Sequence, residues 1–174
     1  MVRKNQLTGN ISPSPIIDAD MVYIFGGFRS SGSHAIHAGG KGDVTDTRVA
    51  WTSLSSSYVA TPLLHDSHLY WIDDRGQAWC THAEDGSLVY RERVKDLQSG
   101  GRPVYASPIL IGDRIFVVTR RDGTLVLPAS PEFKVLHQNR INSDPFDFNG
   151  TPAVTGDASF LRSDRAIYCI KTAS

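Results

Sequence analysis

The sequence is poor in the features that would assign it an activity. It has only two cysteines and two methionines in 174 residues, and its 18 basic and 18 acidic residues give a formal net charge of zero. Without a basic surface the chain has no electrostatic footprint for nucleic acid or an anionic membrane, so we expect neither as a partner. No segment approaches the run of about 20 apolar residues that crosses a membrane as a helix.

The amino-terminal segment also lacks the pattern of an export signal. A basic pair, Arg3-Lys4, is present, but no apolar run follows it as in a secretory leader. The sequence therefore leaves the localisation open. Residues 1–11 are polar, and we expect them to be either a lead or the source of a strand that closes the fold.

A short pattern recurs four times along the chain. Each copy has a small hydroxyl residue, a proline and two apolar residues, and Pro15, Pro62, Pro108 and Pro152 lie 47, 46 and 44 residues apart. Self-similarity with a period in the forties is typical of propellers and solenoids. No stretch carries a sustained apolar stripe at helical spacing, so a helical solenoid fits poorly.

Each copy continues with the features of β-strands. A tight turn rich in Asp, Gly or Ser follows the proline pattern, and a β-branched and aromatic run comes next. These second segments are residues 21–25, 69–72, 115–118 and 160–161, the third are expected at 35–37, 78–80, 125–127 and 167–169, and the fourth at 49–51, 88–90 and 134–136. The last copy has no fourth segment. Four short strands in roughly 45 residues match a propeller blade.

We therefore predict an all-β fold, a β-propeller of four four-stranded antiparallel blades of which the last is incomplete. The expected blades span residues 12–55, 56–101, 102–146 and 147–174. The open edge of the last blade needs cover. Three arrangements stay open: the four blades close alone with a strand from the amino-terminal segment, two chains form an eight-blade ring, or the chain is the carboxyl-terminal part of a longer propeller.

The second copy carries a resemblance to a known family. Its run from Thr61-Pro62 through Asp74-Arg75-Gly76 and Ala78-Trp79-Cys80 to Leu88-Val89-Tyr90 resembles the PQQ-like, or quinoprotein-like, β-propeller repeat. The resemblance extends over about residues 12–171. The same repeat builds quinoprotein dehydrogenases and an outer-membrane assembly lipoprotein, so it is specific for the repeat and not for a function.

The resemblance implies what an enzyme of this family would need. Quinoprotein enzymes hold pyrroloquinoline quinone (PQQ) and a Ca²⁺ ion with carboxylates, and many have a disulfide between adjacent cysteines. Here no two cysteines are adjacent, no Glu or Asn set around Asp144 and Asp147 suggests an ion cage, and no Gly-x-Ser-x-Gly motif is present. We expect no catalytic residue and no cofactor, and a scaffold that binds a protein partner or a small ligand; a PQQ-dependent oxidoreductase is the alternative.

Histidine spacing does not predict a metal site. His34 and His37 are three residues apart, as are His65 and His68. We expect all four at the surface, on strand ends and turns, where residues three apart in a strand point to opposite faces. Neither pair has the further ligands of a zinc site.

The two cysteines predict thiols rather than a disulfide. Cys80 and Cys169 fall at corresponding strand positions of the second and fourth blades. Such positions are too far apart for the Cα separation of about 4.4–6.8 Å that a disulfide needs. We expect two buried thiols that act as small apolar side chains.

Aromatic residues recur shortly before the repeat proline. Tyr58, Tyr105 and Phe148 have this place in three of the four copies. In the family arrangement they lie at the mouth of the central channel, which makes them the candidate contacts for a ligand or partner. Packing between neighbouring blades is the alternative role for these side chains.

Overall fold

The computed structural model describes residues 7, 9–27, 31–97 and 101–171 of the chain. These residues form four antiparallel sheets and contain no helix, hence none of the length and apolarity needed to span a membrane. Each sheet is one blade. Blade 1 has β1 (Ile16–Asp18), β2 (Met21–Gly26), β3 (Gly32–His37) and β4 (Val49–Ser53); blade 2 has β5 (Leu63–His65), β6 (His68–Ile72), β7 (Gln77–His82) and β8 (Leu88–Arg93); blade 3 has β9 (Ile109–Ile111), β10 (Arg114–Val118), β11 (Thr124–Pro128) and β12 (His137–Asn139); blade 4 has β13 (Ala153–Thr155), β14 (Ala158–Arg162) and β15 (Ile167–Lys171).

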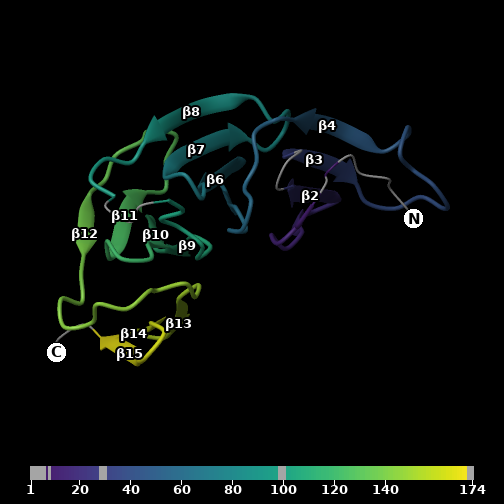
Figure 1. Cartoon of the computed structure of the whole chain (residues 1–174). Coiled ribbons are helices and arrows are strands. Elements are labelled where there is room, and N and C mark those ends of the chain that lie inside the picture. Colours follow the sequence, from purple (N-terminus) through teal and green to yellow (C-terminus); the bar gives the residue numbers. More distant parts are fainter. Residues whose placement is uncertain (1–6, 8, 28–30, 98–100, 172–174) are drawn as a thin grey trace.

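The blades follow one another along an open arc, with blade 1 and blade 4 at its two ends (Figure 1). Within each blade the strands lie side by side in sequence order. The first strand is on the concave side of the arc and the fourth on the convex side (Figure 1). The predicted all-β propeller of four blades, the last incomplete, is confirmed, since blade 4 has three strands among the described residues.

The first two strands of every blade are joined by a tight turn. Such turns require left-handed backbone, which glycine adopts without steric cost. Gly112 (φ 59°) and Gly156 (φ 56°) supply it in blades 3 and 4. Blades 1 and 2 use Ala19 (φ 49°), Asp66 (φ 44°) and Ser67 (φ 59°), so in these two hairpins residues with a side chain adopt the same conformation.

The two faces of a blade pack against different neighbours. We call the face toward the following blade the forward face and the opposite one the rear face. Strands 2 and 3 place an aromatic and a small or branched residue together on every forward face, in the pairs Tyr23 and Ala35, Tyr70 and Cys80, Phe116 and Val126, and Phe160 and Cys169. Because side chains alternate along a strand, the residues between them form the rear face.

The hydrophobic core consists of layers between neighbouring blades. In the layer between blades 1 and 2, Tyr23 and Phe25 meet Leu69 and Trp71. Trp71 is 2% exposed, and its ring lies edge-on to Phe25 at 5.4 Å. Such a layer buries apolar area from both blades, so a blade face without a neighbour stays in contact with solvent.

The layer between blades 2 and 3 is packed in the same way. Tyr70 and Cys80 of the forward face meet Ile115, Leu125 and Leu127 of the rear face. All five residues are at most 5% exposed.

The outer strands are also tied together. Trp51 of β4 donates from Nε1 to the carbonyl of Ala83 in blade 2, at 2.9 Å. Its ring lies against Gly86, where a Cβ atom would approach it to 2.7 Å. Gly86 has φ +71°, so both the turn and the close contact require glycine at this position.

The fourth strand of blade 3 corrects the sequence prediction. We expected it at residues 134–136, and β12 comprises His137–Asn139 instead. Val126 pairs with His137, and the amide of Leu136 still donates to the carbonyl of Val126 at 2.8 Å. Further along β11 stands Pro128, which has no N–H to donate, so the ladder ends there.

Two expectations about single residues were wrong. His34 is not a surface residue at a turn, because it lies within β3 and is 7% exposed. Cys80 is buried as expected, but Cys169 is exposed. Cys169 belongs to the forward face of blade 4, and no following blade covers that face in the described part of the chain.

The remaining histidines and the amino-terminal segment add two details. His65 and His68 pair directly across the β5–β6 hairpin, so they do not lie along one strand. The closing strand expected from residues 1–11 falls mainly outside the described residues. The described Ile11 lies against Gly26 of blade 1, where an added Cβ atom would be 2.8 Å from its Cγ2.

Candidate functional site

The small hydroxyl residue of the repeat connects each blade to the next. The amide of Ser14 donates to Thr61 Oγ1 (2.9 Å), that of Thr61 to Ser107 Oγ (2.9 Å), and that of Ser107 to Thr151 Oγ1 (3.0 Å). We call these four residues the hydroxyl belt. The recurring hydroxyl residue is visible in all four copies of the sequence repeat. Its role as a hydrogen-bond acceptor between blades became visible only in the structure.

The hydroxyl belt ends differently at the two ends of the arc. Every link runs from the amide of one blade to the hydroxyl of the following blade. Within the described residues the hydroxyl of Ser14 accepts no hydrogen bond, and the amide of Thr151 donates none. Both residues are exposed. Blade 1 therefore presents an acceptor and blade 4 a donor, which are the complementary groups that interior blades use.

The two ends of the arc also expose apolar side chains. Ile17 on the rear face of blade 1 is 71% exposed, and Ile167 on the forward face of blade 4 is 74% exposed. The position of Ile167 corresponds in blade 2 to Ala78, which is 1% exposed. Each end face thus exposes an apolar side chain, although Ile36 and His34 on the rear face of blade 1 are buried, at 4% and 7% exposed.

The three predicted site residues all lie at joints between blades. The guanidinium of Arg102 lies 5.2 Å from the ring centre of Tyr58, and that of Arg120 lies 5.0 Å from the ring centre of Tyr105. Phe148 is buried and its ring stacks on that of Tyr168 at 6.0 Å. An arginine over an aromatic face is attracted by the ring quadrupole. These contacts hold the joints, and a ligand contact at a channel mouth stays a prediction for Tyr58, Tyr105 and Phe148.

An arginine pair fastens the joint between blades 3 and 4. Asp147 accepts from Arg120 and also from Nε of Arg121, at 2.5 Å, while Nε of Arg120 donates to the side chain of Asn149 at 2.9 Å. The Arg121 hydrogen bond lowers the pKa of Asp147, and the charges of both arginines act in the same direction. The carboxylate therefore stays ionised and keeps both arginines in place.

A groove of about 710 Å³ lies between blades 1 and 2, and Tyr58 and Arg102 are among its lining residues. Arg91 lies over the ring of Trp79 at 4.5 Å, and Nε1 of Trp79 donates to Asp73 at 3.0 Å. Burial, and then the neighbouring charge of Asp73, raise the pKa of Asp74, which pairs with Arg102 at 3.6 Å. These polar groups of the groove contact one another, and they do not point together at a single position where a ligand would bind.

The arrangement of these groups suits packing and hydrogen bonding. In residues 7, 9–27, 31–97 and 101–171 no three side chains of His, Cys, Asp or Glu are placed to hold a metal ion together. The features that could contact another molecule are therefore the end faces, the hydroxyl belt and the aromatic joints. Sequence reasoning identified the aromatic residues before the repeat prolines and the recurring hydroxyl, but not the end faces, since these depend on which face of a blade is covered.

Comparison with known proteins assigns the fold. No family model matches the sequence, and no curated protein sequence matches it significantly. Solved structures do match. BamB from Moraxella catarrhalis is 15% identical with a TM-score of 0.63, and the match covers 87% of this chain and 43% of that chain. A quinohemoprotein alcohol dehydrogenase from Comamonas testosteroni is 13% identical with a TM-score of 0.57, over 90% of this chain and 29% of that chain.

A europium-containing methanol dehydrogenase is also similar, at 11% identity and a TM-score of 0.50, over 66% of this chain and 22% of that chain. These structures are PQQ-like β-propellers, so the chain has the PQQ-like repeat fold that its sequence resembles. Identities this low show the fold alone. The chain spans less than half of the length of each of these proteins.

Proposed function

We propose that this chain is a non-catalytic protein-binding scaffold whose two end faces dock against further propeller blades, supplied by a second copy of the chain. The observation that carries the proposal is the exposure of Ile17 (71%) and Ile167 (74%) at the two ends of the arc. A monomer that keeps these two side chains in water forgoes the burial that stabilises the interior layers.

The end faces are complementary in chemistry. The forward face of blade 4 presents Phe160 and Cys169, the counterparts of Tyr70 and Cys80. In blade 2 that pair packs against the apolar rear face of blade 3. The rear face of blade 1 carries Ile17, an apolar residue at the place where such a partner would meet it. A forward face of one chain thus fits a rear face of another in the manner already used within the chain.

The hydroxyl belt supports the same orientation. Docking head to tail brings the amide of Thr151 in one copy toward the hydroxyl of Ser14 in the other, which continues the pattern of the three internal links. Two copies joined in this way make the same contact twice. The result is a closed two-fold assembly of eight blades.

The molar mass in solution tests the proposal directly. Light scattering coupled to size exclusion should give about twice the chain mass of 19.1 kDa. The variant Ile167→Glu places a charge in the docked face and should return the mass to that of one chain. Leu88→Glu is the matched control, because Leu88 is an exposed apolar strand residue of blade 2 (54%) away from both end faces.

Two results would overturn the proposal. One is a wild-type mass of a single chain at the highest concentrations that can be reached. The other is binding of PQQ, the cofactor of the quinoprotein alternative. If the proposal holds, mixing the protein with PQQ and Ca²⁺ leaves the absorption spectrum of the quinone unchanged. A saturable spectral change would replace the scaffold by a PQQ-binding domain.

A further inference from the structure

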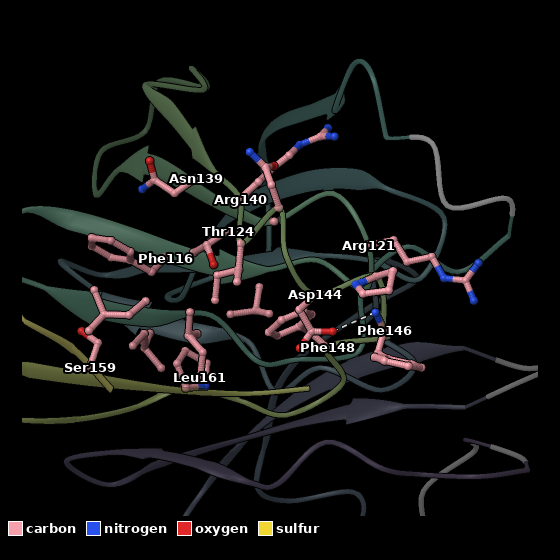
Figure 2. Close-up of a pocket in the computed structure, with 18 of the residues that line it drawn as sticks. Phe116, Arg121, Thr124, Asn139, Arg140, Asp144, Phe146, Phe148, Ser159 and Leu161 are labelled. Carbon is pink, nitrogen blue, oxygen red and sulfur yellow. Dashed lines mark hydrogen bonds between the residues drawn. The ribbon is translucent and has the colours of Figure 1, made fainter. Parts of the chain in front are cut away.

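The layer between blades 3 and 4 differs from the other two layers because it contains a cavity. The buried cluster there has only four members, Ala106, Val118, Phe148 and Leu161. Beside it lies a cavity of about 410 Å³ between the forward face of blade 3 and the rear face of blade 4 (Figure 2). This volume is within the range of small-molecule sites in proteins.

One position in β14 contributes to the open space. Ser159 pairs with Val154, as Leu69 pairs with Leu64 in blade 2 and Ile115 with Leu110 in blade 3. Leu69 is 0% exposed and Ile115 is 1% exposed, so each of these fills its layer completely. A serine in the same place leaves out most of a branched apolar side chain, and the missing volume stays open.

The opposite wall shows the effect of this substitution. Phe116 on the forward face of blade 3 is only half-buried, whereas Tyr70 at the corresponding position of blade 2 is 2% exposed. Phe116 lines the cavity together with Phe146 and Phe148, which come from the linker between the two blades. Aromatic faces on two sides of an open space favour a flat aromatic guest.

The charged groups near the cavity are turned away or already engaged. Arg121 and Arg140 extend from the lining toward its outside (Figure 2). Asp144 accepts from the hydroxyl of Tyr168 at 2.6 Å and from the amide of Phe146 at 2.9 Å. The neutral hydroxyls of Ser159 and Thr124 also line the cavity, and they make no side-chain hydrogen bond within the described part of the chain.

We infer that the cavity between blades 3 and 4 is a binding site for a small, neutral, aromatic molecule that carries one hydroxyl group. The aromatic walls take the ring system, and Ser159 or Thr124 takes the hydroxyl as a hydrogen-bond partner. A carboxylate in the same place would lose its hydration without gaining a paired cation, which disfavours an anionic guest. The site is separate from the end faces and is complete in one chain.

The probe for this inference is 2-naphthol, measured by isothermal titration calorimetry against the full chain. We expect saturable binding with one site per chain. The charged analogue 2-naphthoate has the same ring system and should bind at least about tenfold more weakly, because the arginines of the lining, Arg121 and Arg140, extend outward and are paired with Asp147 and Asp122.

Three variants test the location. Ser159→Leu places a leucine in the cavity, at the position that Leu69 has in its own layer, and should weaken 2-naphthol binding by at least about tenfold. Ser159→Val fills it in part and should fall between the wild type and Ser159→Leu. Ser87→Leu is the matched control, because Ser87 is exposed in the turn before β8, away from the cavity and from both end faces, and it should bind as the wild type does.

Circular dichroism shows which variants are folded, and Ser159→Val decides the matter if Ser159→Leu does not fold. Wild-type affinity in folded Ser159 variants would overturn the inference. Equal binding of 2-naphthoate and 2-naphthol would overturn it too, as would no heat of binding for 2-naphthol at its solubility limit.

Discussion

The amide of Ser107 donates to Thr151 Oγ1 across the joint between blades 3 and 4, at 3.0 Å. The hydroxyl of the same serine accepts from the amide of Thr61, at 2.9 Å, across the joint between blades 2 and 3. Ser107 thus takes part in two successive links of the hydroxyl belt. The small hydroxyl residue in each repeat is an inter-blade contact, which explains why either Ser or Thr can occupy the position.

Ser107→Ala should destabilise the protein by about 1 kcal/mol, because the partly buried amide of Thr61 loses its acceptor. Urea denaturation followed by tryptophan fluorescence measures the change. Thr47→Val is the control, since Thr47 is exposed in the loop between β3 and β4, and it should be close to neutral. Equal free energies of unfolding for the two variants would show that the belt does not stabilise the fold.

Trp71→Ala should cost about 3–5 kcal/mol, because it removes the largest fully buried side chain of the layer between blades 1 and 2. The ring of Trp71 stacks on Trp79 at 5.5 Å, and its Nε1 donates to the carbonyl of Ser56 at 3.1 Å. Trp71→Phe keeps most of the apolar volume and should cost less than half as much. Chemical denaturation distinguishes the two, and similar losses would point to the hydrogen bond rather than to packing.

Asp147→Asn should lower stability at neutral pH by about 1 kcal/mol through the loss of charge-assisted hydrogen bonds to Arg120 and Arg121. The folded state holds the pKa of Asp147 below its ordinary value, so the folded protein binds fewer protons than the unfolded chain in acid. The contribution is therefore complete above the unfolded pKa of about 3.9 and is lost as the pH falls through the lowered folded value.

The measurement is the difference in unfolding free energy between wild type and Asp147→Asn from pH 6 to pH 2. It should shrink toward zero at the acid end. Asp157→Asn is the control, because the carboxylate of Asp157 lies 3.8 Å from Lys171 with both side chains exposed. A difference that does not depend on pH would assign the effect to packing.

Ser159→Leu should stabilise the ligand-free protein by roughly 1 kcal/mol, since the added side chain is buried in the cavity between blades 3 and 4. For a chain of this length that gain corresponds to a rise in Tm of about 2–4 °C. Differential scanning calorimetry measures it. A lower Tm would mean that the walls formed by Phe116 and Leu161 have no room for leucine.

The two thiols should react at very different rates with a thiol reagent such as 5,5′-dithiobis(2-nitrobenzoic acid). Burial raises the pKa of Cys80 to about 12, and its sulfur is inaccessible, whereas Cys169 is exposed. One thiol per chain should react in the native protein and two after denaturation. Cys169→Ser should abolish the native reaction.

The same reagent gives a second view of the proposed assembly. Cys169 lies on the forward face of blade 4, which the second copy would cover. Its reaction rate should therefore rise on dilution, as the assembly dissociates. A rate that is independent of protein concentration would argue against contact at this face.

The sequence by itself determined the repeat and the strands. The spacing of Pro15, Pro62, Pro108 and Pro152 predicted four blades, and the β-branched and aromatic runs predicted the second and third strands of each. These features are local, since a strand needs only its own residue types and a turn at each end. The position of β12 was missed because it depends on Pro128 in the neighbouring strand, a pairing partner that the local pattern does not identify.

The tertiary structure alone decided which faces are covered. Cys80 and Cys169 have the same place in their repeats, yet one is buried and the other exposed, since among the described residues blade 2 has a neighbour on its forward face and blade 4 has none. The cavity at Ser159 and the arginines over Tyr58 and Tyr105 likewise involve residues from different blades. Whether a residue is buried depends on the blade packed against it, so the sequence of a single repeat does not predict its burial.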